Sequence, residues 1–362
     1  MASAIVTGAT GITGSAIVHH LQKDASYKKI YALSRTELCR INRTMISNFI
    51  QALEKTGAIS KLKRFILTCG FKQYSVHLGN AKQPFHEDDP VLEGEVGSET
   101  WPPNFYFTQQ RILAEAAARS KNQWDWVVTL PQDVPGFARG NLMNEATAVG
   151  LYCTVSKALS GSELPFPGCK AGYFAFNTWT SANLHAKFCL WAATAKGAGN
   201  NIFNVINGDT ESWQDLWPRL ASRFGCKIPN PMLPHGGTAS TKGYKDYESS
   251  TVRMPNKHPL STRASDLGVS SDPSKEESPT LFCQINPEKW AAREDVNKAW
   301  DQVRDKYGLD QKAWQKAWEK ATWDFLTFAL GRDWSCVGTR NVFETLEKEG
   351  ILPPLERLKD DF

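Results

Sequence analysis

The sequence lacks several features that would assign it to a particular class of protein. Its 362 residues carry a net charge of only +4, with no basic stripe interleaved with aromatic residues, so we expect no nucleic-acid partner. No apolar run is long enough to cross a bilayer or to serve as a signal peptide. The eight cysteines include no Cys-x-x-Cys pair, and the histidines lack ligand spacing. We therefore expect a soluble cytoplasmic protein with reduced thiols, no metal and no membrane partner.

What is present begins at the N-terminus, where a short β-branched run meets three glycines, Gly8, Gly11 and Gly14. Apolar residues at helical spacing follow, so the segment is predicted to form a strand, a tight turn and a helix. Glycines at this spacing permit the turn, a close approach of backbone to pyrophosphate, and contact between helix and strand. The pattern is typical of a dinucleotide-binding βαβ unit. Together with Thr10 and Ile12, these glycines are our candidates for cofactor binding.

The second predicted strand, residues 28–35, ends in Ser34 and Arg35. In dinucleotide-binding folds an acidic residue at this point binds the ribose hydroxyls, whereas a basic residue accommodates a 2′-phosphate. Because no carboxylate is present here, both residues are further candidates for cofactor binding and NADPH is the expected cofactor. An arginine at the end of a strand is otherwise an ordinary surface residue, and that interpretation stays open.

Strand-like and helix-like patterns alternate along the first third of the chain. Helices are predicted over 36–57 and 104–120, a buried strand over 64–70, and a further strand over 124–130 that is ended by Pro131. This alternation is typical of an α/β fold with a Rossmann-like, doubly wound parallel sheet. We expect an NADP-binding Rossmann domain over residues 1–137, with a later strand near 201–207 returning to its sheet.

The remainder, residues 138–362, is predicted to be a mostly helical substrate lobe. Helices are expected over 142–160, 181–196 and 213–224, and in a tryptophan-rich segment that starts near residue 290. Residues 229–280 are rich in Pro, Gly, Ser, Thr and Lys and poor in large apolar groups, which indicates a long, flexible, partly ordered loop. Tryptophans at helical spacing most often pack in a core, and we expect that role here.

The candidates for catalysis are a tyrosine and a lysine. A reductase that uses NADPH needs a proton donor beside the nicotinamide. The donor is usually a tyrosine, and a nearby lysine lowers the pKa of its phenol. The common Tyr-x-x-x-Lys spacing is absent, because Gln110 stands four residues after Tyr106. Lys72, however, directly follows a predicted strand, at the edge where cofactors bind in such sheets. Taken singly, Lys72 would be a surface lysine and Tyr106 a packing residue.

Three longer motifs resemble those of one known family of enzymes. Gly-Phe-Lys-Gln-Tyr at 70–74, Pro-Asn-Phe-Tyr-Phe-Thr-Gln-Gln at 103–110 and the segment from Phe203 to Trp217 resemble the motifs of the progesterone 5β-reductase/iridoid synthase-like (PRISE) family. This is a family of atypical short-chain dehydrogenase/reductases, and the motif sequences of this chain are similar to those of its fungal branch. The resemblance covers most of residues 1–226.

The resemblance implies an activity and roles for individual residues. Members of the family use NADPH to reduce the carbon–carbon double bond of an α,β-unsaturated carbonyl, in small-molecule and often secondary metabolism. By resemblance, Tyr106 and Lys72 are the catalytic pair, and Pro131 and Val134 line the nicotinamide pocket. The family commonly has a second tyrosine where Phe107 stands here, which leaves Tyr106 as the phenol that acts.

The chain also departs from the family pattern. Arg35 runs almost directly into the helix that in the family follows a third strand, another helix and a fourth strand, so on the order of 50 residues are missing. A second, shorter gap is indicated near residues 336–341. The expected sheet therefore lacks two strands. One of them would stand beside the first strand, whose central edge is then expected to have no neighbour.

Three functions stay open at this point. The first is an NADPH-dependent enone reductase with a small-molecule substrate. The second is a carbonyl reductase, or an epimerase/dehydratase-like enzyme, on the same fold, since tyrosine and lysine also serve carbonyl chemistry. The third is a truncated, non-catalytic remnant of the family. A homodimer is also left open.

Overall fold

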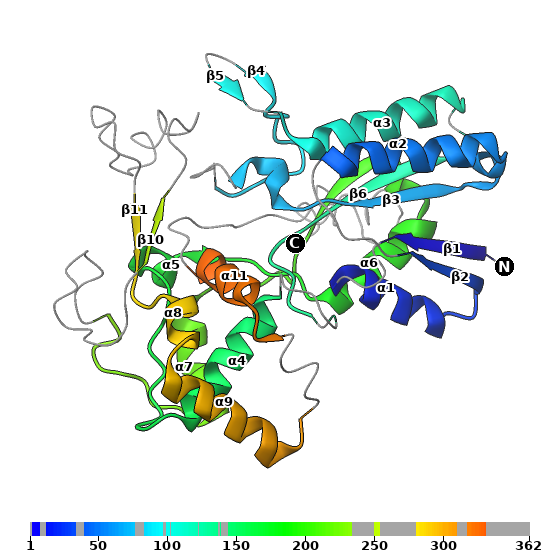
Figure 1. The fold of residues 1–362 in the computed structure, drawn as a ribbon. Helices are drawn as coiled ribbons and strands as arrows, with labels where there is room; N and C mark the ends of the chain where they lie inside the picture. Colours follow the sequence, from blue (N-terminus) through cyan, green and yellow to red (C-terminus); the bar gives the residue numbers. More distant parts are fainter. Residues whose placement is uncertain are drawn as a thin grey trace, which may run out of the picture.

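The computed structural model describes residues 2–7, 12–33, 40–76, 83–96, 99–101, 103–121, 123–136, 138, 144–233, 250–253, 280–309 and 317–330. Parallel strands with flanking helices form one part of the molecule, and a group of helices from the second half of the chain forms another (Figure 1). No helix in these ranges is long and apolar enough to span a bilayer.

The larger parallel sheet contains three strands. They are β3 (Arg64–Thr68), β6 (Asp125–Pro131) and β8 (Asn201–Val205), in the order β3-β6-β8. The central strand, β6, is apolar along most of its length and pairs on both sides, and its last five residues are buried. Strand β8 comes from far along the chain and completes this sheet, which positions the carboxyl ends of β3 and β6 at one edge.

Helices cover both faces of this sheet. Helices α2 (Arg40–Lys55) and α3 (Phe105–Arg119) pack on one face, and α6 (Ala182–Thr194) lies on the other, between the sheet and α1 (Figure 1). The side chains of β3 alternate accordingly: Phe65 and Leu67 pack with α2 and α3, whereas Ile66 packs with α6. The predicted α/β fold is confirmed.

The N-terminal βαβ unit forms a second, separate sheet. Strands β1 (Ala2–Thr7) and β2 (Tyr27–Leu33) pair in parallel, and α1 (Ile12–Lys23) connects them. Among the described residues, β1 pairs only with β2 and β3 pairs only with β6. The parallel strands are thus divided between two sheets at the place where the sequence predicts a missing strand. Contact between α1 and α6 holds the two parts together.

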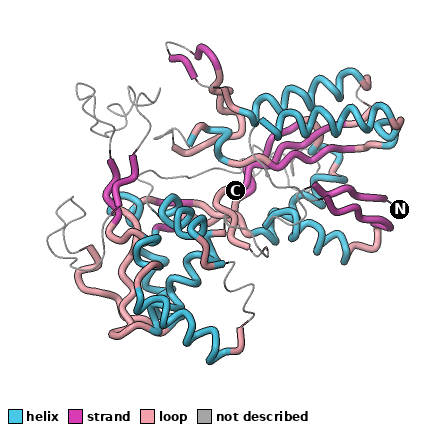
Figure 2. The backbone as a smooth tube through the Cα atoms, in the orientation of Figure 1, coloured by secondary structure: helices cyan, strands magenta, loops and turns pink. Residues whose placement is uncertain are grey.

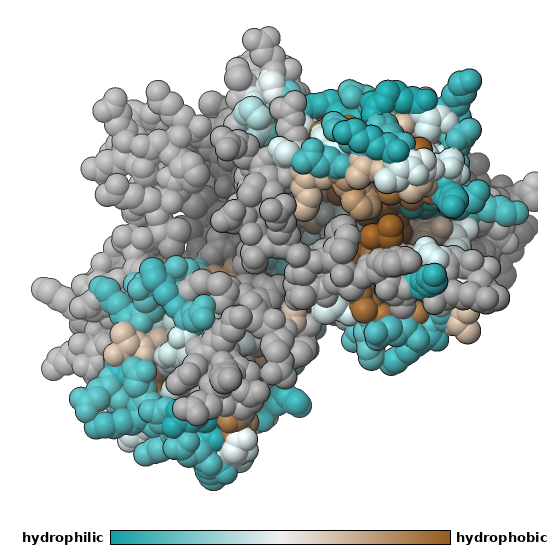
Figure 3. Space-filling view, turned by 45° about the vertical axis from the view of Figure 1, so that its right-hand side comes forward, coloured by the Kyte–Doolittle hydropathy of each residue, from teal (hydrophilic) through white to brown (hydrophobic). Residues whose placement is uncertain are grey.

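The division leaves apolar side chains at the surface. The prediction of a buried strand over 64–70 is wrong for β3, whose five residues are only partly buried or exposed. In β1, the side chain of Ile5 is 50% exposed. Both observations have one cause, since within the described ranges each of these two strands has a neighbour on one side only. The space-filling view shows apolar surface between two hydrophilic regions on this side of the molecule (Figure 3).

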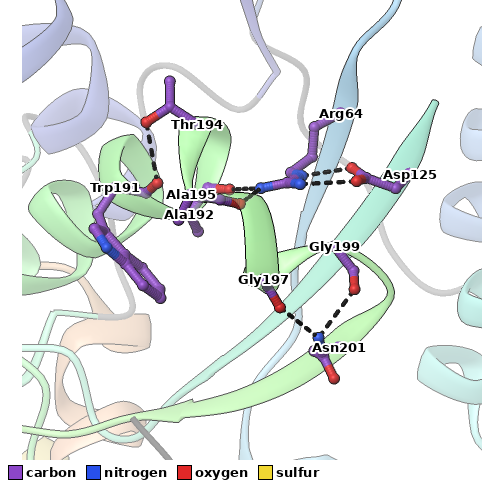
Figure 4. Close-up of polar contacts among 9 residues, drawn as sticks. All are labelled: Arg64, Asp125, Trp191, Ala192, Thr194, Ala195, Gly197, Gly199 and Asn201. Carbon is purple, nitrogen blue, oxygen red and sulfur yellow. Dashed lines mark hydrogen bonds and ion pairs between the residues drawn. The ribbon is translucent and has the colours of Figure 1, made fainter. Parts of the chain in front are cut away.

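An ion pair locks the amino end of the sheet to α6. The guanidinium of Arg64 donates two hydrogen bonds to the Asp125 carboxylate, at 2.5 and 2.7 Å, and so joins β3 to β6. It also donates to the carbonyl oxygens of Ala192 and Ala195 at the carboxyl end of α6 (Figure 4). Acceptors at a helix carboxyl end favour a cation. This contact fixes α6 against the sheet at the end opposite the candidate site.

The second part of the molecule is mostly helical (Figure 2). Its helices are α4 (Glu145–Ala158), α5 (Lys170–Phe174), α7 (Trp213–Phe224), α8 (Pro287–Ala291), α9 (Glu294–Tyr307) and α11 (Lys320–Leu330). They enclose one large apolar core that contains Tyr152, Trp217 and Trp290. Tryptophan rings pack on one another there, with Trp300 and Trp318 centroids 4.0 Å apart. The tryptophans among the described residues therefore have the core role that the sequence predicts.

Short elements complete the description. The antiparallel pairs are β4 (Gly94–Val96) with β5 (Glu99–Trp101), β7 (Phe176–Asn177) with β9 (Glu211–Ser212), and β10 (Ser250–Arg253) with β11 (Thr280–Cys283). The 3-10 helices are η1 (Ala58–Lys61), η2 (Phe71–Tyr74) and η4 (Lys196–Ala198). Within the predicted loop 229–280, residues 250–253 are thus a strand, whereas 234–249 and 254–279 lie outside the described residues.

Candidate active site

The candidate site lies where β3 and β6 end. Tyr106 is the second residue of α3, and its half-buried ring packs on the apolar cluster at this edge of the sheet. Its hydroxyl lies beside Gly70: a Cβ atom on Gly70 would be 3.5 Å from Tyr106 Oη and 3.3 Å from the carbonyl oxygen of Pro131. Three residues predicted as site or motif residues therefore meet at one point. A side chain at Gly70 would therefore contact the hydroxyl.

Lys72 lies in η2, directly after Gly70. Its side chain is exposed, whereas Phe71, Gln73 and Tyr74 on either side of it are buried. The turn is short because Gln73 N donates to the Gly70 carbonyl oxygen at 2.9 Å. The neighbours anchor the segment and leave the ammonium group at the surface, on the segment that contacts α3.

A buried tyrosine that sequence reasoning did not single out anchors this segment. Tyr74 Oη donates to Asn204 Oδ1 in β8 at 2.8 Å, and its ring stacks on Phe85 with centroids 4.6 Å apart. Burial and the nearby Glu87 carboxylate raise the pKa of Tyr74 above its ordinary value. This phenol therefore stays protonated and serves as an anchor. The sequence offered a signal, because Tyr74 ends the motif that contains Lys72.

Beside Tyr106 the sheet edge continues toward the N-terminal unit. Val134, which follows β6, belongs to a small apolar cluster with Ile12, Ala138 and Ala182. Ile12 is the first residue of α1, so the start of the helix that follows the glycine motif lies against the segment that follows Pro131. The structure thus brings together Ile12 and Val134, two of the predicted cofactor-binding residues. Pro131, a third, ends β6 with its carbonyl oxygen beside Gly70. Gly14 is buried within α1.

The remaining predicted cofactor residues are not placed. Gly8, Thr10, Gly11, Ser34 and Arg35 lie outside the described residues. The phosphate-binding turn and the end of the second strand therefore stay predictions from the sequence.

A cysteine beside the site is not a nucleophile. Burial raises the pKa of Cys69 to about 12, because a thiolate would lose its hydration there.

Gln110 occupies the usual position of the catalytic lysine, four residues after the tyrosine. Its side chain donates to Gln73 Oε1 at 2.8 Å. No group of three metal-ligating side chains occurs among the residues that the structure describes.

With this geometry in place, similarity to known proteins identifies the family. A family model described as a PRISE-like Rossmann-fold domain matches residues 35–242, more than half of the chain. The chain belongs to this family of atypical short-chain dehydrogenase/reductases, as the motifs indicate. The match starts where β2 has just ended.

Individual relatives are similar to different extents. An uncharacterized protein of Schizosaccharomyces pombe is 29% identical over 410 residues, which covers 99% of this chain and 95% of the relative. Short chain dehydrogenase gsfE of Penicillium aethiopicum is 34% identical over 188 residues, 52% of this chain and 47% of the relative. For the 3-oxo-Delta(4,5)-steroid 5-beta-reductase of Arabidopsis thaliana the identity is 33% over 197 residues, 53% and 48%. The chain spans about half the length of these last two relatives.

The alignment with the Schizosaccharomyces pombe protein also bears on the missing segment. It is 410 positions long whereas the chain has 362 residues, so at least 48 positions have no residue of this chain opposite them.

Solved structures are similar to this chain only at low identity. UDP-glucuronic acid 4-epimerase of Bacillus cereus with NAD has a TM-score of 0.45 and 13% identity, covering 62% of this chain and 85% of that one. RMD of Pseudomonas aeruginosa with NADPH has a TM-score of 0.46 and 13% identity, covering 63% and 84%.

Proposed function

We propose that the chain is an NADPH-dependent reductase of an α,β-unsaturated carbonyl in small-molecule, secondary metabolism. Its family is one of nicotinamide-dependent oxidoreductases, which gives the coarser class. The observation that carries the finer proposal is the position of the Tyr106 hydroxyl beside Gly70 and the Pro131 carbonyl, at the carboxyl edge of the parallel sheet. In open α/β sheets this edge is where cofactor and substrate bind.

The residues at this edge fit the nicotinamide end of such a cofactor. Gly70 provides a surface without a side chain next to the phenol, at a place that a Cβ atom would fill. Pro131 ends β6, Val134 follows it along the same edge, and Ile12 starts the helix after the glycine motif. These residues would hold the nicotinamide half. The preference for NADPH rests on Ser34 and Arg35 in the sequence.

In the proposed mechanism the protein's own residues handle charge and protons. A nicotinamide held at this edge would supply the hydride that the β-carbon of the enone accepts. Tyr106 donates a hydrogen bond to the carbonyl oxygen of the substrate, where negative charge develops as the enolate forms. The Lys72 ammonium makes the phenol a stronger donor by its positive charge. The α-carbon of the enolate then takes a proton from solvent water, so that one hydride and one proton have been added across the double bond.

Phe107 is consistent with a single acting phenol. Its side chain is buried in the core of the sheet domain. A tyrosine at this position would follow Tyr106 in the sequence, but its side chain would be buried like that of Phe107. The oxyanion contact is therefore assigned to Tyr106 alone.

The test is turnover of the Tyr106→Phe variant, which removes only the hydroxyl. We expect NADPH oxidation in the presence of an enone to fall roughly 100-fold or more, as for loss of one preorganised donor. Tyr307→Phe is the matched control, because Tyr307 is exposed at the end of α9, and it should keep full activity. Unchanged turnover in Tyr106→Phe would remove this tyrosine from the mechanism. Activity with saturated ketones but not with enones would favour a carbonyl reductase instead.

The divided sheet favours one alternative, a non-catalytic remnant of the family. Strands β1 and β3 share no hydrogen bonds in the described part of the chain, so the two halves of a dinucleotide site depend on helix packing for their alignment. A remnant would show neither stabilisation by NADPH nor turnover. An enzyme would show both.

A further inference from the structure

We propose that Asn104 is a positioning residue that fixes Tyr106 and Lys72 relative to each other; this inference rests on the proposed function. Asn104 precedes α3 and is 5% exposed. Its Oδ1 atom accepts a hydrogen bond from the backbone N–H of Tyr106 at 3.0 Å. Its Nδ2 atom donates to the backbone carbonyl oxygen of Lys72 at 2.7 Å. One side chain thus bonds to the backbones of both residues of the pair.

Helix capping explains only half of this arrangement. Ser, Thr and Asp cap a helix about as well as Asn, because capping needs only an acceptor. The bond to Lys72 needs a donor as well. An ionised Asp has no donor, and Ser and Thr carry donor and acceptor on a single oxygen, whereas the amide of Asn places them on two separate atoms. Asn104 uses both its acceptor and its donor. The choice of residue at this position is therefore narrower than helix capping alone requires.

The contact acts on the segment that carries Lys72. The Lys72 carbonyl oxygen also accepts from Ser75 N at 3.0 Å, which closes the turn of η2. The rest of this segment is anchored to other elements, by Gln73 to Gln110 in α3 and by Tyr74 to Asn204 in β8. Asn104 adds the bond at Lys72 itself, where the exposed side chain contributes no anchoring. Its loss would remove the bond that ties Lys72 to the start of α3, at the residue of the segment whose position matters for the chemistry.

Two substitutions separate the two bonds. Asn104→Asp keeps an acceptor for Tyr106 N and removes the donor to Lys72, with nearly unchanged shape. Asn104→Ala removes both bonds. The matched control is Asn144→Asp, because Asn144 is a buried cap of α4 in the helical part, where it accepts from Thr147 N at 3.1 Å. All three variants are compared with the full wild-type chain.

The first measurement is amide hydrogen exchange, which needs no activity. In Asn104→Asp we expect about tenfold faster exchange of the amides in 71–76, with the start of α3 unchanged. In Asn104→Ala both segments should exchange faster, and in Asn144→Asp neither. If exchange in 71–76 is unchanged in Asn104→Asp, the bond does not hold Lys72 and the inference is overturned.

The second measurement is steady-state turnover with an enone. A shift of Lys72 by a fraction of an ångström should lower kcat of Asn104→Asp about tenfold, while the KM for NADPH stays close to the wild-type value. Wild-type kcat in this variant would overturn the positioning role. A wild-type chain without any turnover would end the proposed function, and the placement of Lys72 by Asn104 would then be decided by hydrogen exchange alone.

Discussion

Ile12 and Gly136 approach so closely that a Cβ atom on Gly136 would lie 2.6 Å from Ile12 Cγ2, and 2.5 Å from the Cβ atom of Ala182. Ile12 starts α1, and Ala182 starts α6. Because β1 forms no ladder with β3 among the described residues, packing of this kind between α1, Gly136 and α6 fixes the N-terminal unit to the rest of the described chain. A glycine is required here by the space available.

Gly136→Ala should therefore loosen the N-terminal unit. The added methyl group overpacks this contact, which is expected to cost about 1–3 kcal/mol. Most of that cost should appear as a weaker binding free energy for NADPH, and less of it as a lower free energy of unfolding. Isothermal titration with NADPH and a thermal melt measure the two effects. Gly150→Ala is the control, since α4 leaves open space at Gly150 and alanine favours a helix. Wild-type affinity in Gly136→Ala would show that this contact does not align the cofactor site.

Gly70→Ala tests the surface beside the phenol. The backbone at Gly70 is extended, with φ 166°, so alanine can adopt it. The added methyl group would crowd the Pro131 carbonyl oxygen and touch the Tyr106 hydroxyl. We expect a folded protein whose turnover falls about tenfold, because the reacting groups are displaced. Turnover equal to that of the wild type would mean that nothing needs to bind at this surface.

The stability of the fold should depend on pH through His185. This histidine is fully buried in α6, with Nε2 2.9 Å from Thr129 Oγ1 in β6, and burial lowers its pKa to about 4. Its pKa in the unfolded chain is about 6.5. The neutral form is thus favoured by folding, so its full contribution is present above pH ~6.5 and is lost as the pH falls toward 4, by about 3 kcal/mol.

Thermal melts between pH 7 and 4 check this prediction. The melting temperature of the wild type should fall steadily over this range, and the fall should be smaller in His185→Gln, which cannot titrate. Equal slopes for the two proteins would mean that other groups cause the loss of stability.

The Arg64–Asp125 pair should matter far more than an exposed ion pair. The side chain of Arg64 is 9% exposed, so Asp125→Asn would leave a buried cation with only part of its bonds. We expect a loss of about 3–5 kcal/mol in urea unfolding. Arg219 with Glu211 is the matched exposed pair, and Glu211→Gln should cost less than about 1 kcal/mol. Similar losses for both pairs would show that the contact in Figure 4 does not lock the sheet to α6.

Sequence patterns predicted the individual elements better than their assembly. The helix predicted over 213–224 is α7, because a serine cap, an apolar stripe and a terminal glycine all act locally. The missing strand was also predictable, since it follows from the length between two recognisable segments. The exposure of β3 was not, because the apolar run of Phe65 to Leu67 is the same whether or not a neighbouring strand is present.

The candidate site shows the same limit. Tyr106 and Lys72 were found from motifs, and Gly70 was included in one of them. Asn104 bonds to the backbones of Tyr106 and Lys72, and Asn204 accepts from Tyr74 two residues after Lys72; both roles depend on which elements meet in space. Side-chain amides serve as caps, turn residues and surface groups, so composition and spacing do not distinguish an anchor.

The most direct test of the whole account is the melting temperature of the purified chain with and without NADPH. If the divided sheet still forms a dinucleotide site, NADPH at 100 times its dissociation constant should add about 2.7 kcal/mol of stability, and the shift should be larger than with NADH. A cooperative melt that neither cofactor moves would contradict the account. The family motifs would then be carried by a chain that does not bind the cofactor.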